Sequence, residues 1–249
     1  MITRASVQFH DETVEIDLSK PIDISIPLRF DGKNPNAWYV EQPKIEPVKF
    51  GDWVGSVAEG GDVNFKNIWF SPHANGTHTE TVGHVTKELV SINEHLKTFF
   101  FFTEVVSITP EQNGDDMVIT KSMLTESLTT TAEAIVIRTL PNSDEKLLKE
   151  YSHTNPTYME PEAAAWLRDR GIKHLLIDLP SIDKEKDDGA LKAHHIFWDT
   201  ENDIRYDATI TEFIYVPNTI SDGTYVLNLQ IASFENDASP SKPVLYKIE

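Results

Sequence analysis

Apolar residues follow two kinds of pattern along this chain, and both kinds predict β-strands. Residues 13–18 (TVEIDL) alternate between polar and apolar positions, and residues 24–28 (ISIPL) continue the alternation until Pro27 interrupts it. Residues 99–108 and 132–140 instead form short apolar runs rich in β-branched and aromatic side chains. Runs of this kind are typical of strands that are covered on both faces. A sheet is therefore expected to begin early in the chain and to have a buried centre.

A helix is expected after the second apolar run. Pro161 fits the first helical position, residues 163–167 carry an apolar stripe, and Gly171 supplies the stop. Residues 172–180 (IKHLLIDLP) then return to the pattern of a buried strand. A helix between two apolar strands is typical of a βαβ unit, so the pattern predicts an α/β or α+β fold.

Residues 71–84 (SPHANGTHTETVGH) gather three histidines and a glutamate just after the strand-like stretch 64–71. His78, Glu80 and His84 share even parity, so their side chains point to one face if the chain is extended. In a helix, at about 100° per residue, His78 and Glu80 would lie about 200° apart. Imidazole nitrogens with a carboxylate suit zinc, and also manganese or iron(II) with more oxygen ligands. The spacing indicates a metal site, and the alternative is a polar loop that merely borders the core.

His73 is the exception to this register. It lies five residues before His78, so on a regular strand it faces the other side unless the turn-prone pair Asn75-Gly76 reverses the parity. His73 is therefore a candidate ligand that needs a local change of backbone direction.

A second group of candidate residues lies in residues 180–198, after the expected buried strand. Asp183 precedes the pair His194-His195 there. Adjacent side chains on a strand point in opposite directions, so one histidine is expected to reach a site shared with the first cluster. Glu212 stands among β-branched and aromatic residues, where a lone carboxylate is costly unless it is paired or bound to metal. The alternative for Glu212 is a solvent-facing position on an edge strand.

The charge of the chain bears on its partners. The formal net charge is −18, and this argues against a nucleic-acid partner because phosphate binding requires basic patches. Acidic residues are dense in 183–189 and in 234–239, which are most simply solvated loops.

Length and composition set further bounds. A chain of 249 residues with no evident long linker is expected to form one domain spanning residues 1–249. It has no apolar run long enough to span a membrane and no signal-peptide core, so a cytoplasmic location without a membrane partner is expected. Because cysteine is absent, any metal must be held by histidine and carboxylate.

The order of these motifs resembles the cyclase family of metal-dependent hydrolases, which includes kynurenine formamidases and isatin hydrolases. The stretch GTHTETVGH (76–84) is similar to the family signature GTHxDxPxH. Residues 159–183 are similar to its helix–strand segment that ends in a DxxSxD element. The likeness spans nearly the whole chain. It also covers EIDLSKPI (15–22), which is similar to the family's DLS segment, and the histidine pair, Glu212 and DASPSKP (237–243), which follow in the expected order.

The resemblance implies roles for individual residues. His78 would be a metal ligand, and Glu80 stands where the family has a metal-binding aspartate. His84 matches a histidine that handles protons, and would take a proton from water and pass it to the leaving group. His194 and Glu212 match the more distant ligands.

Four positions depart from the family pattern. The remaining family ligand is a histidine at the position of Ala74, so His73, one residue earlier, would need a local bulge to reach the ion. If His73 does not reach the ion, the first metal position differs from that of the family. Glu80 is one methylene longer than the usual aspartate, Val82 replaces the signature proline, and Lys242 stands where an arginine is usual.

The resemblance also implies a fold and an activity. The fold would be a swivelling β/β/α-type single domain with mixed β-sheets and peripheral helices, assembled as a homodimer or larger homo-oligomer. One or two Zn²⁺ or Mn²⁺ ions would activate water to hydrolyse an amide, formamide, lactam or lactone in a small, for example aromatic, substrate. The alternatives are a metal- or small-molecule-binding relative without hydrolase activity, and a metal-dependent cyclase or dehydratase. Candidates to line a pocket for a flat substrate are Trp38, Trp53, Trp69 and Trp198.

Overall fold

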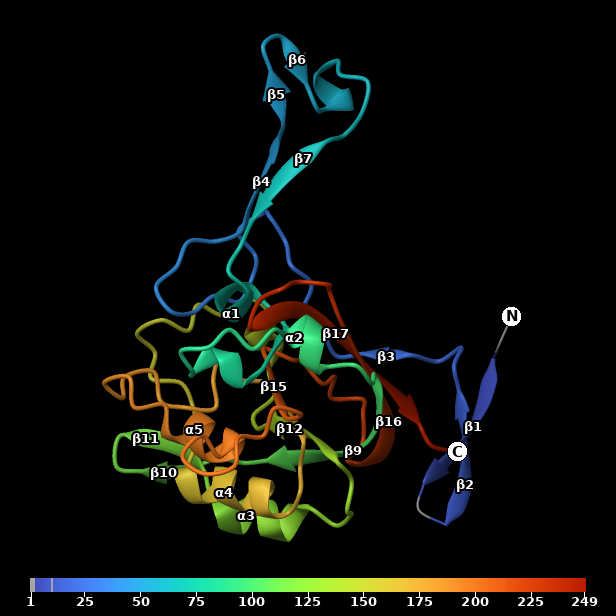
Figure 1. Ribbon diagram of the computed structural model, residues 1–249, viewed down its shortest axis with the longest axis vertical. Helices are drawn as coiled ribbons and strands as arrows, with labels where there is room; N and C mark the ends of the chain where they lie inside the picture. Colours follow the sequence, from blue (N-terminus) through green and yellow to red (C-terminus); the bar gives the residue numbers. More distant parts are fainter. Residues whose placement is uncertain (1–2, 10) are drawn as a thin grey trace.

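Seven strands of mixed direction close into a ring in the computed structural model, which describes residues 3–9 and 11–249 (Figure 1). The order around the ring is β16 (Gly223–Ile231), β9 (Phe100–Ile108), β12 (Ala134–Thr139), β14 (His174–Ile177), β15 (Thr209–Glu212), β8 (His78–Glu80) and β17 (Ala238–Lys247). Pairing of β16 with β17 closes the ring, and β3 (Ile22–Asp23) adds to β17 from outside. From β9 to β15 the strands are parallel, whereas β8, β17 and β16 pair antiparallel with their neighbours. This mixed α/β architecture confirms the fold class expected from the sequence.

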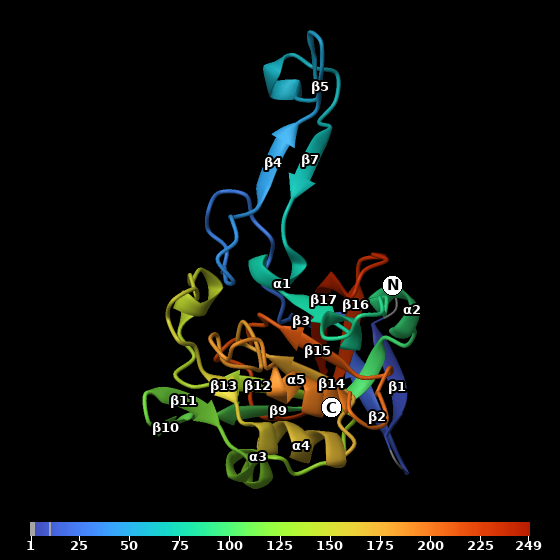
Figure 2. The same ribbon diagram turned by 60° about the vertical axis from the view of Figure 1, so that its left-hand side comes forward.

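The apolar runs lie in the centre of this sheet because both faces of their strands are buried. On β12, Ile135 and Ile137 belong to the apolar cluster on the helix side, while Ala134 and Val136 belong to the cluster on the opposite face. The helix side is covered by α3 (Lys121–Ser127), α4 (Pro161–Asp169) and α5 (Lys192–Trp198) (Figure 2). Because α4 links the parallel strands β12 and β14, the predicted βαβ unit is confirmed.

The early strand predictions are confirmed in part. The strand β2 (Glu12–Asp17) pairs with β1 (Arg4–Phe9) as an antiparallel hairpin. The expected strand over 24–28 is wrong, because beyond β3 the backbone forms an isolated bridge at Ser25 and Pro27 offers no N–H to extend it.

A hairpin arm, defined as residues 44–69, projects from the body in both views (Figures 1 and 2). Its strands are β4 (Lys44–Pro47), β5 (Lys49–Phe50), β6 (Trp53–Val54) and β7 (Lys66–Trp69). Its exposed large apolar side chains are Phe50, Val57, Val63, Phe65, Ile68 and Trp69. The apolar stretch 64–71 predicts a strand, but it gives no sign that this strand stands away from the core.

The remaining elements are short. A separate small sheet contains β10 (Glu111–Asn113), β11 (Asp116–Ile119) and β13 (Tyr158–Met159). One-turn helices are α1 (Pro72–Asn75) and α2 (Ile92–His95), and 3-10 turns occur at Val57–Glu59, Val82–His84 and Asp144–Leu147. Among the helices of the described residues, none combines the length and apolar character needed to cross a membrane.

The buried His174 on β14 links stability to pH. Its Nδ1 lies 2.9 Å from Thr209 Oγ1, and its ring centroid lies 3.9 Å from that of Phe101. Burial, together with the charge of Lys173, lowers the pKa of His174 from 6.5 to about 4. The unfolded chain therefore binds a proton at this residue at a higher pH than the folded chain does. The stabilising contribution is complete above pH 6.5 and is lost as pH falls toward 4.

We expect His174→Gln to flatten the pH dependence of the unfolding free energy. The wild-type chain should lose about 3 kcal/mol between pH 7.5 and pH 4 through this residue, and the variant should lose that much less. Urea unfolding at both pH values measures the difference. His153→Gln, at an exposed histidine, is the control and should follow the wild-type curve. Parallel curves for the wild type and His174→Gln would contradict the assignment.

Candidate metal centre

The adjacent strands β8 and β15 bring His78, Glu80 and Glu212 together. His78 and Glu80 lie on β8 with their side chains on one face, and both are fully buried. The register of β8 against β15 pairs His78 directly with Glu212, so His78 Nε2 lies 3.5 Å from Glu212 Oε2. Glu212 is buried on an inner strand of the ring, so the alternative of a solvent-facing glutamate on an edge strand is wrong.

Turns on either side of β8 carry the other two histidines of the first cluster. His73 lies on the one-turn helix α1 before β8, and His84 ends the 3-10 turn after it. The rings of His73 and His84 are stacked, with centroids 4.3 Å apart. The helical turn α1 thus directs His73 to the same side as His78 despite the odd spacing between them. His84 reaches the cluster through the 3-10 turn and not through strand parity.

His194 is the member of the histidine pair that faces the cluster. Its Nε2 lies 3.2 Å from Glu80 Oε1, and its Nδ1 lies 2.6 Å from Asp183 Oδ2. The pair lies on helix α5, so the expectation of a strand is wrong there. Asp183 explains the helix, because its carboxylate also accepts the backbone N–H groups of Ala193 and His194 in the first turn.

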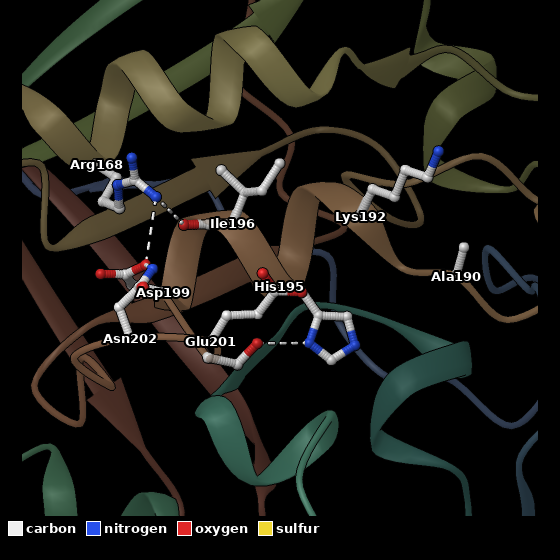
Figure 3. A pocket seen from close by; sticks show the side chains of 9 residues that line it. Arg168, Ala190, Lys192, His195, Ile196, Asp199, Glu201 and Asn202 are labelled. Carbon is white, nitrogen blue, oxygen red and sulfur yellow. Dashed lines mark hydrogen bonds and ion pairs between the residues drawn. The ribbon is translucent and has the colours of Figure 1, made fainter.

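His195 points into a different depression of the surface (Figure 3). Its Nδ1 lies 2.7 Å from Thr200 Oγ1, and the surrounding side chains include Arg168 and Asn202. Adjacent residues on a helix are separated by about 100°, which is enough to direct His195 away from Glu80.

Three histidines have their outer ring nitrogen fixed by an oxygen acceptor. His73 Nε2 lies 2.9 Å from Asp237 Oδ2, and His78 Nδ1 lies 3.0 Å from the Gly76 carbonyl oxygen. His194 uses Asp183 in the same way. When the outer nitrogen donates its proton, the inner nitrogen keeps a lone pair, which is the usual arrangement of metal-binding histidines.

The inner atoms of this cluster lack hydrogen-bond partners among the described residues. They are His73 Nδ1, His78 Nε2 and Glu80 Oε2, and all three are buried. The nitrogen atoms lie 3.0 and 3.9 Å from the carboxylate oxygen; the longer contact is too long for a hydrogen bond, and the shorter one does not have the geometry of a hydrogen bond. Ligand atoms about 2.1 Å from one ion lie about 3.0 Å apart at a right angle and up to about 4.2 Å apart on opposite sides, a range that covers both distances. The three atoms therefore fit the donor set of a divalent cation, and leaving them unpaired would be costly.

Glu80 is central because its two oxygens face different groups. Oε2 faces His73 and His78, whereas Oε1 faces His194. Glu212 completes the second side, since its Oε1 lies 3.7 Å from His194 Nε2 and accepts the N–H of Ile182. With one oxygen on each side, the Glu80 carboxylate could bridge two cations.

The electrostatics of the cluster favour positive charge. Burial alone would lower the pKa of His73, but its hydrogen bond to Asp237 and the negative charge of Glu80 outweigh burial and raise the pKa to about 10. Asp183 and Glu80 raise the pKa of His194 to about 10 against the same effect of burial. Burial would raise the pKa of Glu80, but the neighbouring histidines hold it well below its usual range. The carboxylates thus attract protons to the histidines, and a divalent cation could replace these protons.

Asp237 is the residue that the sequence interpretation missed. It lies in the acidic stretch 234–239, which was expected to be a solvated loop, yet its side chain is largely covered and meets His73. Its Oδ2 also lies 3.6 Å from His84 Nδ1. Asp237 begins DASPSKP, a segment noted only because it follows the other family motifs in the expected order. No local pattern distinguishes Asp237 from its solvated neighbours.

A cavity of about 300 Å³ opens beside the cluster, and His73, His84 and Glu212 are among the residues that line it. The other lining residues are Trp38, Ser71, Ala74, Ser181, Lys184, Glu185, Asp187 and Leu191. Among the four tryptophans expected to line a pocket, Trp38 lines this cavity, whereas Trp53 and Trp69 lie on the hairpin arm, where Trp69 borders a separate depression. Trp198 is buried in the core and donates its Nε1–H to the Ala208 carbonyl.

Comparisons with known proteins agree with this architecture. The kynurenine formamidase of Bacillus cereus is 25% identical over 235 residues, which cover 94% of this chain and 97% of that protein. The kynurenine formamidase of Bordetella petrii is 23% identical over 234 residues, covering 93% and 97%. Among solved structures, isatin hydrolase A from Labrenzia aggregata superposes with a TM-score of 0.65 at 16% identity, covering 92% of this chain and 94% of that one. A chain from Bacillus stearothermophilus described as a predicted metal-dependent hydrolase gives a TM-score of 0.64 at 17% identity, covering 91% and 98%.

The family match decides the assignment. Residues 16–184, more than half of the chain, match the family described as "Cyclase: Putative cyclase". The match includes the histidine cluster of β8 and the DxxSxD element at the end of β14. The chain belongs to the cyclase family.

Proposed function

We propose that this chain is a metal-dependent hydrolase that cleaves the C–N or C–O bond of a small amide, formamide, lactam or lactone. The observation that carries the proposal is the set of three buried ligand atoms of His73, His78 and Glu80 that make no hydrogen bond within the described residues and lie beside a cavity. The names of the relatives, kynurenine formamidase and isatin hydrolase, point to the same class of substrate.

The proposed ligands form two groups that share Glu80. His73, His78 and Glu80 would hold one Zn²⁺ or Mn²⁺ ion, and His194 and Glu212 would join Glu80 around a second. When bound, such an ion lowers the pKa of a coordinated water to about 7 and polarises a carbonyl oxygen. Asp237 and Asp183 would keep the inner nitrogens of His73 and His194 free for binding.

His84 is proposed to move the proton. It is partly exposed, borders the cavity, and its Nδ1 lies 3.8 Å from Glu80 Oε2. An imidazole can accept and donate a proton near neutral pH, so His84 would take a proton from water and pass it to the leaving group. Trp38, which also lines the cavity, offers a flat apolar surface to an aromatic substrate.

The test is metal analysis followed by turnover. Elemental analysis of the purified protein should report zinc or manganese at one or two ions per chain. Metal-replete protein should hydrolyse at least one compound in a panel of N-formyl amines, cyclic amides and lactones, and chelation should abolish the activity. Bound metal without hydrolysis of any compound would instead favour a binding relative or a cyclase-type reaction, an alternative that Ala74, at the position of a family ligand, keeps open.

We also propose that residues 1–249 form one catalytic domain. The main sheet joins strands from Ile22–Asp23 to Ala238–Lys247, and the cluster needs His194, Glu212 and Asp237 from beyond the family match. The cytoplasmic location stays a prediction from the sequence.

The hairpin arm is the proposed interface of a homodimer or larger homo-oligomer. A two-stranded ribbon is marginally stable alone. The six exposed large apolar side chains of the arm, at about 100 Å² each, would bury about 600 Å² per chain, close to the roughly 800 Å² per partner of a standard interface.

We expect the double variant Phe50→Glu, Trp69→Glu to be monomeric in light scattering where the wild type is at least dimeric. Charged side chains at these positions would have to be desolvated in the interface. Leu89→Glu, at a similarly exposed apolar residue outside the arm, is the control and should keep the wild-type mass. A monomeric wild type would contradict the proposal.

A further inference from the structure

A threonine next to one proposed ligand holds the residue next to another. Thr77 precedes His78, and Phe213 follows Glu212. The Thr77 hydroxyl donates a hydrogen bond to the Phe213 carbonyl oxygen and accepts one from the Ile26 N–H at 2.7 Å. The carbonyl of Thr77 in turn accepts the N–H of Ser241 on β17. One buried residue thus ties three segments together at the edge of the metal centre.

This contact stands where the backbone ladder ends. The last paired residues of β8 and β15 are His78 and Glu212, so Thr77 and Phe213 would form the next pair. Phe213 has a φ of +54°, a left-handed conformation that interrupts the ladder. The side-chain hydroxyl of Thr77 therefore replaces a backbone hydrogen bond at the position where the two ligands face each other.

Phe213 is held in this conformation by its surroundings. A bulky side chain rarely adopts a positive φ, and residues that do so cluster at functional sites. The buried ring of Phe213 lies 6.1 Å from the ring of His78 and 5.7 Å from that of Tyr151, measured between centroids. The backbone N–H of Phe213 donates to the Leu179 carbonyl, two residues before Ser181 of the cavity wall. The turn at Phe213 therefore depends on contacts on both sides of the chain.

We infer that Thr77 is a positioning residue of the metal centre: its hydroxyl locks the turn at Phe213 and so sets the spacing between His78 and Glu212. The inference rests on the proposed function, because it assumes that these two side chains bind metal. The 3.5 Å between His78 Nε2 and Glu212 Oε2 is the separation expected of two atoms around one ion or two adjacent ions.

Thr79 supplies a matched control. It lies two residues further along β8, on the same face as Thr77, and it is equally buried. Its hydroxyl lies 2.8 Å from that of Thr211 on β15. That pair is inside the ladder, where backbone hydrogen bonds already fix the strands, so losing it should weaken packing without moving a ligand.

The experiment titrates metal-free full-length protein with Co²⁺, following affinity and the visible spectrum of the ion. Thr77→Val should weaken Co²⁺ binding about 10- to 100-fold and change the spectrum, as removal of supporting groups around metal ligands does. Thr77→Ser, which keeps the hydroxyl, and Thr79→Val should stay within about threefold of the wild type with an unchanged spectrum.

The outcomes separate the inference from the function that it assumes. If Thr77→Val binds as the wild type does, or if Thr79→Val loses as much affinity, the positioning role is wrong while the metal site stands. If the wild type itself does not bind Co²⁺, the proposed function is wrong. Should Thr77→Val prove unfolded by circular dichroism, Thr77→Ala replaces it in the comparison with Thr77→Ser under the same criteria.

Discussion

Glu80→Gln is expected to remove bound metal from the protein while leaving the fold intact. The glutamine is isosteric, but its amide nitrogen cannot bind a cation, and the negative charge shared between the two sides of the cluster is lost. Removing supporting groups behind metal ligands already costs about 10- to 100-fold in affinity, so loss of the central ligand should cost at least 100-fold, with turnover at background. Elemental analysis and equilibrium titration with Zn²⁺ measure the effect.

Glu104→Gln is the matched control for this substitution. Glu104 is also a buried glutamate of the ring, on β9, but its carboxylate accepts hydrogen bonds from Thr129 and Thr130. Its variant should be less stable and should keep a wild-type metal content. If Glu80→Gln retained the wild-type stoichiometry and affinity, the assignment of Glu80 as the shared ligand would be overturned.

The face shared by His78 and Glu80 could be predicted from the sequence because it depends only on local geometry. Strand parity needs no knowledge of distant residues, and β8 has the extended backbone that parity assumes. The pairing of His78 with Glu212 could not be predicted in this way, because it depends on a register between strands more than 130 residues apart.

The other members of the cluster show where local patterns mislead. The expectation for the histidine pair assumed a strand, but Asp183 satisfies the first N–H groups of α5, and Phe197 and Trp198 pack in the core. Asp237 is an ordinary acidic loop residue in the sequence and acquires a role only because β17 lies beside β8. Burial and partners across the sheet, which a local pattern does not contain, decided both cases.

His84→Gln should separate proton transfer from metal binding. The side chain of His84 is 29% exposed, whereas those of His78 and Glu80 are fully buried. Its Nδ1 lies 3.6 Å from Asp237 and 3.8 Å from Glu80, longer than the 3.0 Å between His73 and Glu80. We therefore expect kcat to fall about 10²- to 10⁴-fold, the usual worth of a general acid or base, with metal content and KM nearly unchanged.

Added imidazole gives this prediction a second readout. Because His84 borders the cavity, its truncation to alanine should leave space for free imidazole, which should restore part of the lost kcat in His84→Ala. His195→Gln, which alters the histidine facing the other depression, should keep wild-type kcat and show no response to imidazole. Geometry also allows a ligand role, since His84 Nδ1 groups with Glu80 and His194. In that case His84→Gln would lose metal together with activity, as Glu80→Gln does, and imidazole would act only by restoring metal binding.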